Sequence, residues 1–308
     1  MITPTNILAA LLTLLPFFAA AFFPAHFTRR ARALPRAARL LAPSLLCIPY
    51  LLVACSAGSF RWGWLALYAL LPVAVAALLD RAAKADPDLP KQRGVWQDFL
   101  VLLVLGLSVD LRWCEPAWPP HLAIFNKILL LDLGLYGFHA LRPLNGVGFD
   151  LRLRLRDLTT GLRELVFYLP IGLILGLGLG FLHFHGFWPV SELAGLDHWG
   201  VWSSILAIPI AWFFTFLFVA VPEELFFRGW LQNLLERRLG RTPALFLTSA
   251  LFGLAHFNKR AVHFNWRYVL LAAIAGLFYG RSWRRDHRVA ASAVTHASVD
   301  AIWSLWLR

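Results

Sequence analysis

Ten mostly apolar stretches recur along this chain, and the short segments between them hold most of the charged residues. A helix needs roughly 20 apolar residues to cross the hydrocarbon core of a bilayer, with about 17–25 tolerated. The pattern therefore predicts an all-α fold, a polytopic transmembrane helical bundle of eight to ten spans. The stretches are 6–27, 40–58, 62–80, 97–111, 121–141, 163–184, 201–222 with a helical continuation to about 236, 243–257, 267–281 and 289–307.

The composition agrees with a membrane environment. Hydrophobic residues make up 59% of the 308 positions and charged residues 15%, which is more apolar surface than a soluble domain of this length can bury. The formal net charge of +12 does not indicate nucleic acid, because the basic residues are scattered between apolar runs and do not gather on one polar face. The expected partner is the lipid bilayer, and no nucleic-acid partner is expected.

The basic residues also predict an orientation. With the N-terminus placed outside, the loops on the inner side hold 20 Lys and Arg residues and those on the outer side hold six. This asymmetry follows the positive-inside rule. The 25 Arg against 4 Lys are typical of a GC-rich bacterial genome. We therefore expect a multi-pass protein of a bacterial inner (plasma) membrane.

A second pattern lies between the predicted spans. Segment 149–156, "FDLRLRLR", alternates apolar and basic residues with period two, which predicts a short strand or extended piece at the membrane surface. A solvated linker is the alternative.

Charged residues follow an apolar run in the stretch "VPEELFFRGW". Glu224 and Arg228 are four apart, so they share a helical face and can pair. Glu223 points about 100° away and has no local match. Pro222 cannot donate a hydrogen bond to the preceding turn, so the helix should loosen there and admit water. An ionisable group inside a bilayer is by default a functional candidate; a structural Glu–Arg pair that joins helices is the alternative.

Three further ionisable residues lie in the last spans: His256, and His296 with Asp300 one turn later. At 1.5 Å per residue, Glu223 and His256 each lie ~20 Å from the predicted inner boundary, His296 ~12 Å and Asp300 ~18 Å. Residues from three helices thus reach similar depths. This predicts one intramembrane polar site that opens towards the cytoplasmic half.

Such a set of residues suits hydrolysis. A carboxylate in apolar surroundings can act as a general base on water, and a histidine beside it can share the proton. Further donors can hold the oxyanion that forms when water attacks a carbonyl. Zinc is an open alternative, because two His and a carboxylate can ligate it. However, the chain has no H-E-x-x-H pair, and its three cysteines form no C-x-x-C pair.

The last 150 or so positions resemble the CPBP family, the CAAX-protease and bacteriocin-processing intramembrane endopeptidases. Each motif alone is weak, but their order and spacing inside apolar helices are specific. The motifs are E-E-x-x-x-R at Glu223, Glu224 and Arg228, F-x-x-x-H at Phe252 and His256, and H-x-x-x-[ND] at His296 and Asp300.

The resemblance implies a metal-free glutamate-dependent protease and two regions: residues 1–148, a transmembrane region of unknown role, and 149–308, the protease core. Many family members carry Asn at the last motif position, whereas an ionised Asp cannot donate a hydrogen bond. Asp300 must then be protonated, or must orient His296, or the oxyanion role falls to another residue. The implied roles are water activation by Glu223 and His256, oxyanion binding by His296 and Asp300, and support of the site by Glu224 and Arg228.

The sequence therefore predicts an integral-membrane endopeptidase without a cofactor. Its substrate would be a membrane-associated peptide or protein with a lipidated, leader or hydrophobic C-terminal segment. Two alternatives stay open. One is a catalytically inactive binding or immunity protein of the same fold. The other is a proton-coupled transporter. Its candidate residues, in or beside the fourth and fifth spans, are Asp98, Asp110, Lys127, Asp132 and His139.

Overall fold

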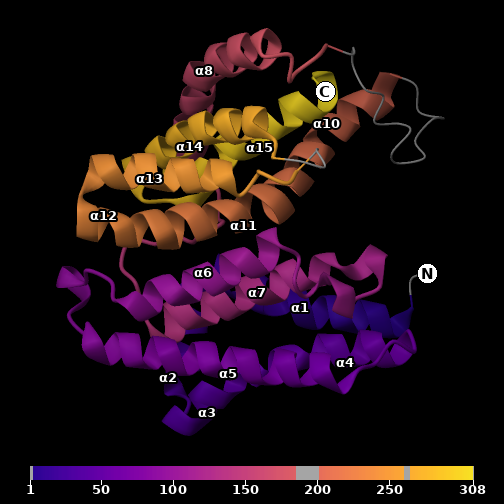
Figure 1. Ribbon diagram of the computed structural model, residues 1–308, viewed down its shortest axis with the longest axis vertical. Coiled ribbons are helices and arrows are strands. Elements are labelled where there is room, and N and C mark those ends of the chain that lie inside the picture. Colours follow the sequence, from indigo (N-terminus) through magenta and orange to yellow (C-terminus); the bar gives the residue numbers. More distant parts are fainter. Residues whose placement is uncertain (1–2, 185–200, 260–263, 308) are drawn as a thin grey trace. The chain divides into compact units, whose positions relative to one another are not determined.

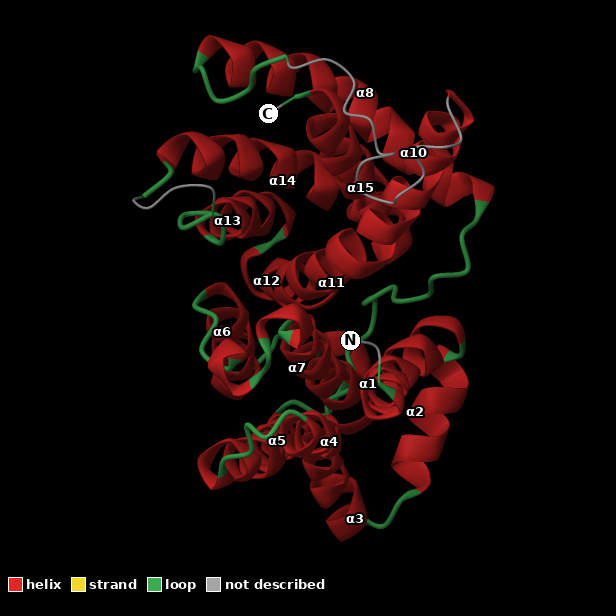
Figure 2. Ribbon diagram, turned by 90° about the vertical axis from the view of Figure 1, so that its right-hand side faces the viewer, coloured by secondary structure: helices red, strands yellow, loops and turns green. Residues whose placement is uncertain are grey.

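A computed structural model of the protein describes residues 3–184, 201–259 and 264–307, with side chains omitted for Pro90 and 201–207. Throughout these ranges the regular structure is helical, apart from one isolated β-bridge between Phe184 and Leu307 (Figure 2). The predicted all-α fold is confirmed. The chain divides into two compact units, residues 1–145 with 149–151, and residues 146–148 with 152–308. The predicted division of function at residue 148 stays a prediction.

The first unit is built from seven helices in the described ranges (Figure 1). Its core includes an aromatic cluster, in which the Trp118 indole donates to the Tyr68 hydroxyl at 2.7 Å and that hydroxyl donates to Asn126 at 2.7 Å. The helices are α1 (Pro4–Phe22), α2 (Pro24–Ala33), α3 (Arg36–Leu41), α4 (Cys47–Ser56), α5 (Trp62–Ala85), α6 (Trp96–Asp110) and α7 (Ile124–Tyr136), which a π-helical turn extends over Gly137–Leu141.

One buried cation holds the polar ends of three of these helices together. Arg142 is fully buried, and its Nη2 lies 2.6 Å from Asp86 while its Nε lies 3.1 Å from Asp98. Asp98 is thus paired with an arginine, as expected for a structural ion pair. Asp132 is buried and has no hydrogen-bond partner among the residues that the structure describes, and His139 faces the Leu135 carbonyl of its own helix.

The second unit contains the long helices of the C-terminal part of the chain. In it α8 packs against α14 and α15, and α13 packs against α14. Gly253 on α13 lets these helices approach closely, because a Cβ there would lie 2.7 Å from that of Ala273. The helices are α8 (Leu155–Gly178), α10 (Val201–Thr215), α11 (Val221–Glu224), α12 (Asn233–Leu239), α13 (Arg241–Leu254), α14 (Trp266–Asp286) and α15 (Val289–Trp306).

The helix that carries the acidic pair runs from α10 to α12 with two wide turns. π-Helical segments occupy Phe216–Ala220 and Leu225–Gln232, so that α11 is a single α-helical turn between them. The first wide turn lies directly before Pro222, where the missing N–H breaks the regular hydrogen-bond ladder. The predicted continuous helix and its loosening are both present, and the helix ends at Leu239 before Gly240, which has φ +83°.

Six helical runs within the described residues are long and apolar enough to cross a membrane: Pro4–Phe22, Arg36–Ser56, Trp62–Ala85, Pro120–Leu141, Leu155–Gly178 and Ile208–Leu239. Helices α6 and α13, with 15 and 14 residues, are shorter than a spanning helix requires. Helices α14 and α15 are long enough, but charged and small polar residues dilute their apolar character. The predicted count of eight to ten spans therefore stays a prediction.

The period-two segment forms no strand. Residues 149–154 are irregular, and α8 begins at Leu155. Arg154 is extended, with φ −110° and ψ 151°, so an extended piece leads into the helix.

Candidate active site

Glu224 is the centre of a buried polar cluster in the second unit. Its side chain is fully buried and lies 3.0 Å, through Oε2, from Nε of Arg228 one turn later. Its other oxygen, Oε1, lies 2.8 Å from Nδ1 of His296, and the Ser292 hydroxyl donates to Oε2. Three partners from two helices therefore neutralise and orient this carboxylate, which leaves it little capacity to act as a base.

Arg228 is held by charge and by aromatic rings. Its contact with Glu224 is an ion pair whose angle is not that of a hydrogen bond, and no nitrogen of the guanidinium donates to a described residue. Its Cζ instead lies 5.0 Å from the ring centre of Phe252 and 6.0 Å from that of Tyr279. Such cation–π contacts strengthen when they are desolvated. Arg228 is thus a buried counter-ion, as the four-residue spacing predicted.

The orientation of His296 is fixed on all sides. Its Nδ1 faces Glu224, and its ring stacks on Tyr279 with ring centres 4.6 Å apart. The Phe252 ring stands nearly perpendicular to it, with ring centres 5.6 Å apart. Nε2 is consequently directed at two other carboxylates, 3.9 Å from Oε2 of Glu223 and 3.5 Å from Oδ2 of Asp300. Both ring nitrogens face acids, an arrangement that favours the doubly protonated imidazolium.

Glu223 differs from its neighbour in exposure and in partners. Its side chain is 15% exposed, whereas that of Glu224 is 0% exposed. Its nearest recorded charges are His296 at 3.9 Å and the ammonium of Lys259 at 3.8 Å. Because its side chain is partly exposed, Glu223 is accessible to a water molecule. Of the two glutamates, Glu223 is the more exposed, as the predicted general base requires.

His256 approaches the cluster from the end of α13. Its Nδ1 lies 2.8 Å from the Phe252 carbonyl, which can only accept, so Nδ1 carries the proton and Nε2 keeps its lone pair. The ring packs against Phe252 and Tyr268, each with centres 4.9 Å apart.

Of the six predicted site residues, five form a chain of ion-pair contacts no longer than 4.0 Å, and His256 joins them through the Phe252 ring. Two members of the cluster were not predicted. Ser292 lies four residues before His296 on α15, so helical spacing could have identified it. Lys259 lies beyond the end of α13, so helical spacing could not predict the position of its side chain.

The residues give limited support to a metal centre. Among the described residues, no group of three or more His, Cys, Asp and Glu side chains is arranged to hold a metal ion. Nδ1 of His296 and Nδ1 of His256 already face protein acceptors. A cofactor-free site stays a prediction.

Part of the chain is similar to a known protein family. Residues 204–302 match the family model described as type II CAAX prenyl endopeptidase Rce1-like. This segment is similar to that family. This match confirms the resemblance drawn from the motifs, and it covers all six predicted site residues. No match was found among the curated proteins or among the solved structures. The six apolar helical runs within the described residues, together with this similarity, indicate an integral membrane protein.

Proposed function

We propose that this Rce1-like protein is an intramembrane endopeptidase that cleaves a peptide bond with water activated by Glu223 and His256. The observation that carries the proposal is the fixed orientation of His296. Its Nδ1 is held by Glu224, and its Nε2 faces the partly exposed Glu223 at 3.9 Å. A candidate base and a candidate oxyanion donor therefore lie next to each other.

The first step is attack by water. Glu223 takes one proton from a water that the Nε2 lone pair of His256 orients, and the water oxygen bonds to the carbonyl carbon. The carbonyl π electrons move to oxygen, and the resulting oxyanion accepts a hydrogen bond from Nε2–H of His296. Because donor and base are already in place, little rearrangement accompanies the change of charge.

The second step breaks the peptide bond. The tetrahedral intermediate collapses, the C–N bond cleaves, and the leaving amine takes the proton that Glu223 accepted. One carboxylic acid and one amine result, and Glu223 returns to its ionised form. Asp300 is a positioning residue in this scheme, because an ionised carboxylate can hold His296 but cannot donate to an oxyanion.

The charges of the cluster support an imidazolium at His296. Three carboxylates, those of Glu223, Glu224 and Asp300, face two permanent cations, Arg228 and Lys259. A protonated His296 brings this group to neutrality, and buried charges are stable only when they are paired.

The substrate that we propose is a membrane-associated peptide or protein: a lipidated tail, a leader peptide or a hydrophobic C-terminal segment. We place the protein in a bacterial inner membrane with the site open towards the cytoplasmic half, in line with the distribution of basic residues along the loops. Cleavage requires no added cofactor in this scheme.

The test is a cleavage assay with the full-length protein in proteoliposomes and a panel of fluorogenic membrane-anchored peptides. Glu223→Gln and His256→Gln should each lower the rate by about 10²–10⁴-fold. Glu115→Gln and His121→Gln, identical changes in the first unit, are the matched controls and should leave the rate unchanged. Undiminished cleavage by both site variants would rule the proposal out. Peptide binding without cleavage by the wild type would favour the binding-protein hypothesis.

A further inference from the structure

Helix α2 is basic and follows an apolar helix, α1, almost directly in the sequence. One residue, Phe23, separates it from α1, whose 19 residues extend about 28 Å at 1.5 Å per residue. That length matches the hydrocarbon core, which is about 30 Å thick. If α1 spans the bilayer, α2 begins at the depth where acyl chains give way to headgroups.

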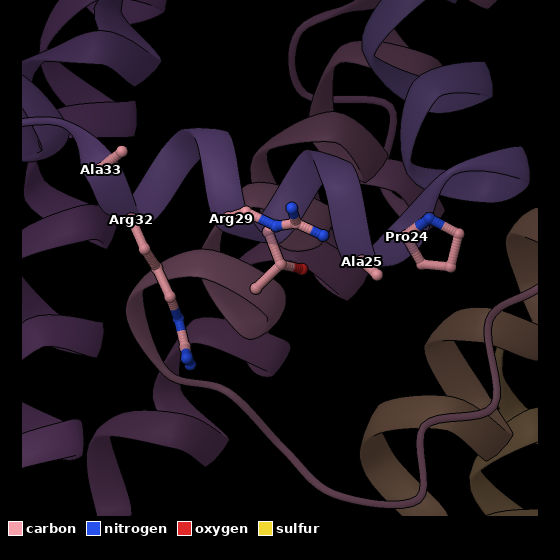
Figure 3. A pocket seen from close by; sticks show the side chains of 6 residues that line it. Pro24, Ala25, Arg29, Arg32 and Ala33 are labelled. Atoms are coloured by element: carbon pink, nitrogen blue, oxygen red, sulfur yellow. The ribbon is translucent and has the colours of Figure 1, made fainter.

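One face of α2 borders a shallow concavity that is widely open to its surroundings. Its lining residues recur at spacings of three and four, so they share one side of the helix. Figure 3 shows Arg29 lying along α2 towards Ala25 and Pro24, with Arg32 about one turn further on. The concavity is lined by Pro24, Ala25, Thr28, Arg29, Arg32 and Ala33.

The two arginines of this face differ from the next one along the chain. Arg36 pairs with Asp80 at 2.8 Å. Arg29 and Arg32 are exposed, and neither has an ion pair or hydrogen bond to any of the residues that the structure describes. Two guanidinium groups therefore present donors to the concavity that no described residue accepts, and the Thr28 hydroxyl lies beside them.

We propose that this face of α2 binds the phosphate of an acidic phospholipid headgroup. The planar guanidinium fork matches phosphate oxygens, and acidic lipid surfaces attract basic residues next to a span. An apolar side chain adjoins this face, because Phe23, directly before Pro24, is 67% exposed. A donor set adjoining exposed apolar surface fits an amphiphile better than a free anion. Basic residues that only orient the protein in the membrane need positive charge alone, and that role would not require a concavity.

The matched control is built into the same helix. Arg30 has the same charge and is also exposed, but it does not line the concavity. Arg29→Gln, Arg32→Gln and Arg30→Gln each remove one positive charge from α2, so a difference among them reports the site and not the net charge.

The experiment is native mass spectrometry of the full-length protein in detergent, titrated with phosphatidylglycerol or phosphatidylcholine of identical acyl chains. We expect wild type to bind phosphatidylglycerol more tightly. Arg29→Gln and Arg32→Gln should each weaken that binding about fivefold, which corresponds to about 1 kcal/mol for one basic residue at a membrane surface. Arg30→Gln should weaken it less than about twofold. Binding of phosphatidylcholine should not change.

Three results would overturn the proposal: equal affinity for the two lipids, an effect of Arg30→Gln as large as that of Arg29→Gln, or full displacement of the lipid by inorganic phosphate at equal concentration. The thermal unfolding midpoint of each variant shows that it is folded. If a Gln variant does not fold, Arg29→Lys keeps the charge but loses the fork, and it should weaken phosphatidylglycerol binding without affecting phosphatidylcholine.

Discussion

Replacement of Glu224 by alanine should destabilise the protein far more than the same change at Glu223, although the two residues are adjacent. The side chains of Glu224 and Arg228 are both fully buried, so water does not screen the pair. Removal of the carboxylate leaves the guanidinium without a counter-charge. Breaking a buried pair from one side costs about 3–5 kcal/mol. Glu223 is partly exposed and its charged neighbours lie 3.8–3.9 Å away, so its removal should cost at most about 1 kcal/mol.

The measurement is the free energy of unfolding of the purified full-length protein in mixed micelles, extrapolated linearly from a denaturant series. Glu224→Ala, Glu223→Ala and the double variant Glu224→Ala/Arg228→Met are compared with wild type. The double variant removes both charges and should recover at least half of the loss, because apolar replacement of a complete buried pair is often nearly neutral. It should not recover cleavage, since His296 has lost its anchor.

Two results would refute this reasoning. A loss below about 1 kcal/mol in Glu224→Ala would show that the pair is not buried or not essential. A double variant less stable than Glu224→Ala would show that Arg228 stabilises the fold through its aromatic contacts and not through Glu224. Neither result depends on the proposed catalytic activity.

Three further predictions can be tested. Ser292→Ala removes a buried donor to Glu224 and should lower the free energy of unfolding by about 1–3 kcal/mol, measured in the same denaturant series; no change would contradict the assigned hydrogen bond. Gly253→Val forces a side chain against the Val269 carbonyl on α14 and should lower the unfolding midpoint and the cleavage rate together, whereas Gly178→Val, in open space, should not disturb helix packing. Millimolar EDTA or phenanthroline should leave cleavage unchanged, and activity lost to chelator and restored by zinc would favour the metal mechanism.

Helical spacing accounts for what could be predicted of the site. Residues four apart share a face, so the Glu224–Arg228 contact and the His296–Asp300 contact follow from the sequence alone. The apolar stretches likewise predicted the helical membrane fold, because length and composition suffice to identify such helices. These inferences depend on local geometry only.

The remaining features depend on tertiary structure. Lys259 lies in an irregular segment, where the sequence contains no periodicity that directs its ammonium to Glu223. The division of labour between the two glutamates is likewise set by α15, which brings Ser292 and His296 to one of them.

The two wide helical turns on either side of α11 constrain the length of the chain in this stretch as well as its amino-acid sequence. Each residue advances a helix by about 100°, so the loss of one position from Phe216–Ala220 would rotate everything before it relative to the acidic pair. The exposed rings of Phe213 and Phe214 would swing inwards, and the Trp212 indole would leave the Ser298 hydroxyl 3.0 Å from it. Insertion or deletion of a single residue in this stretch should therefore abolish function, even where most amino-acid substitutions are tolerated.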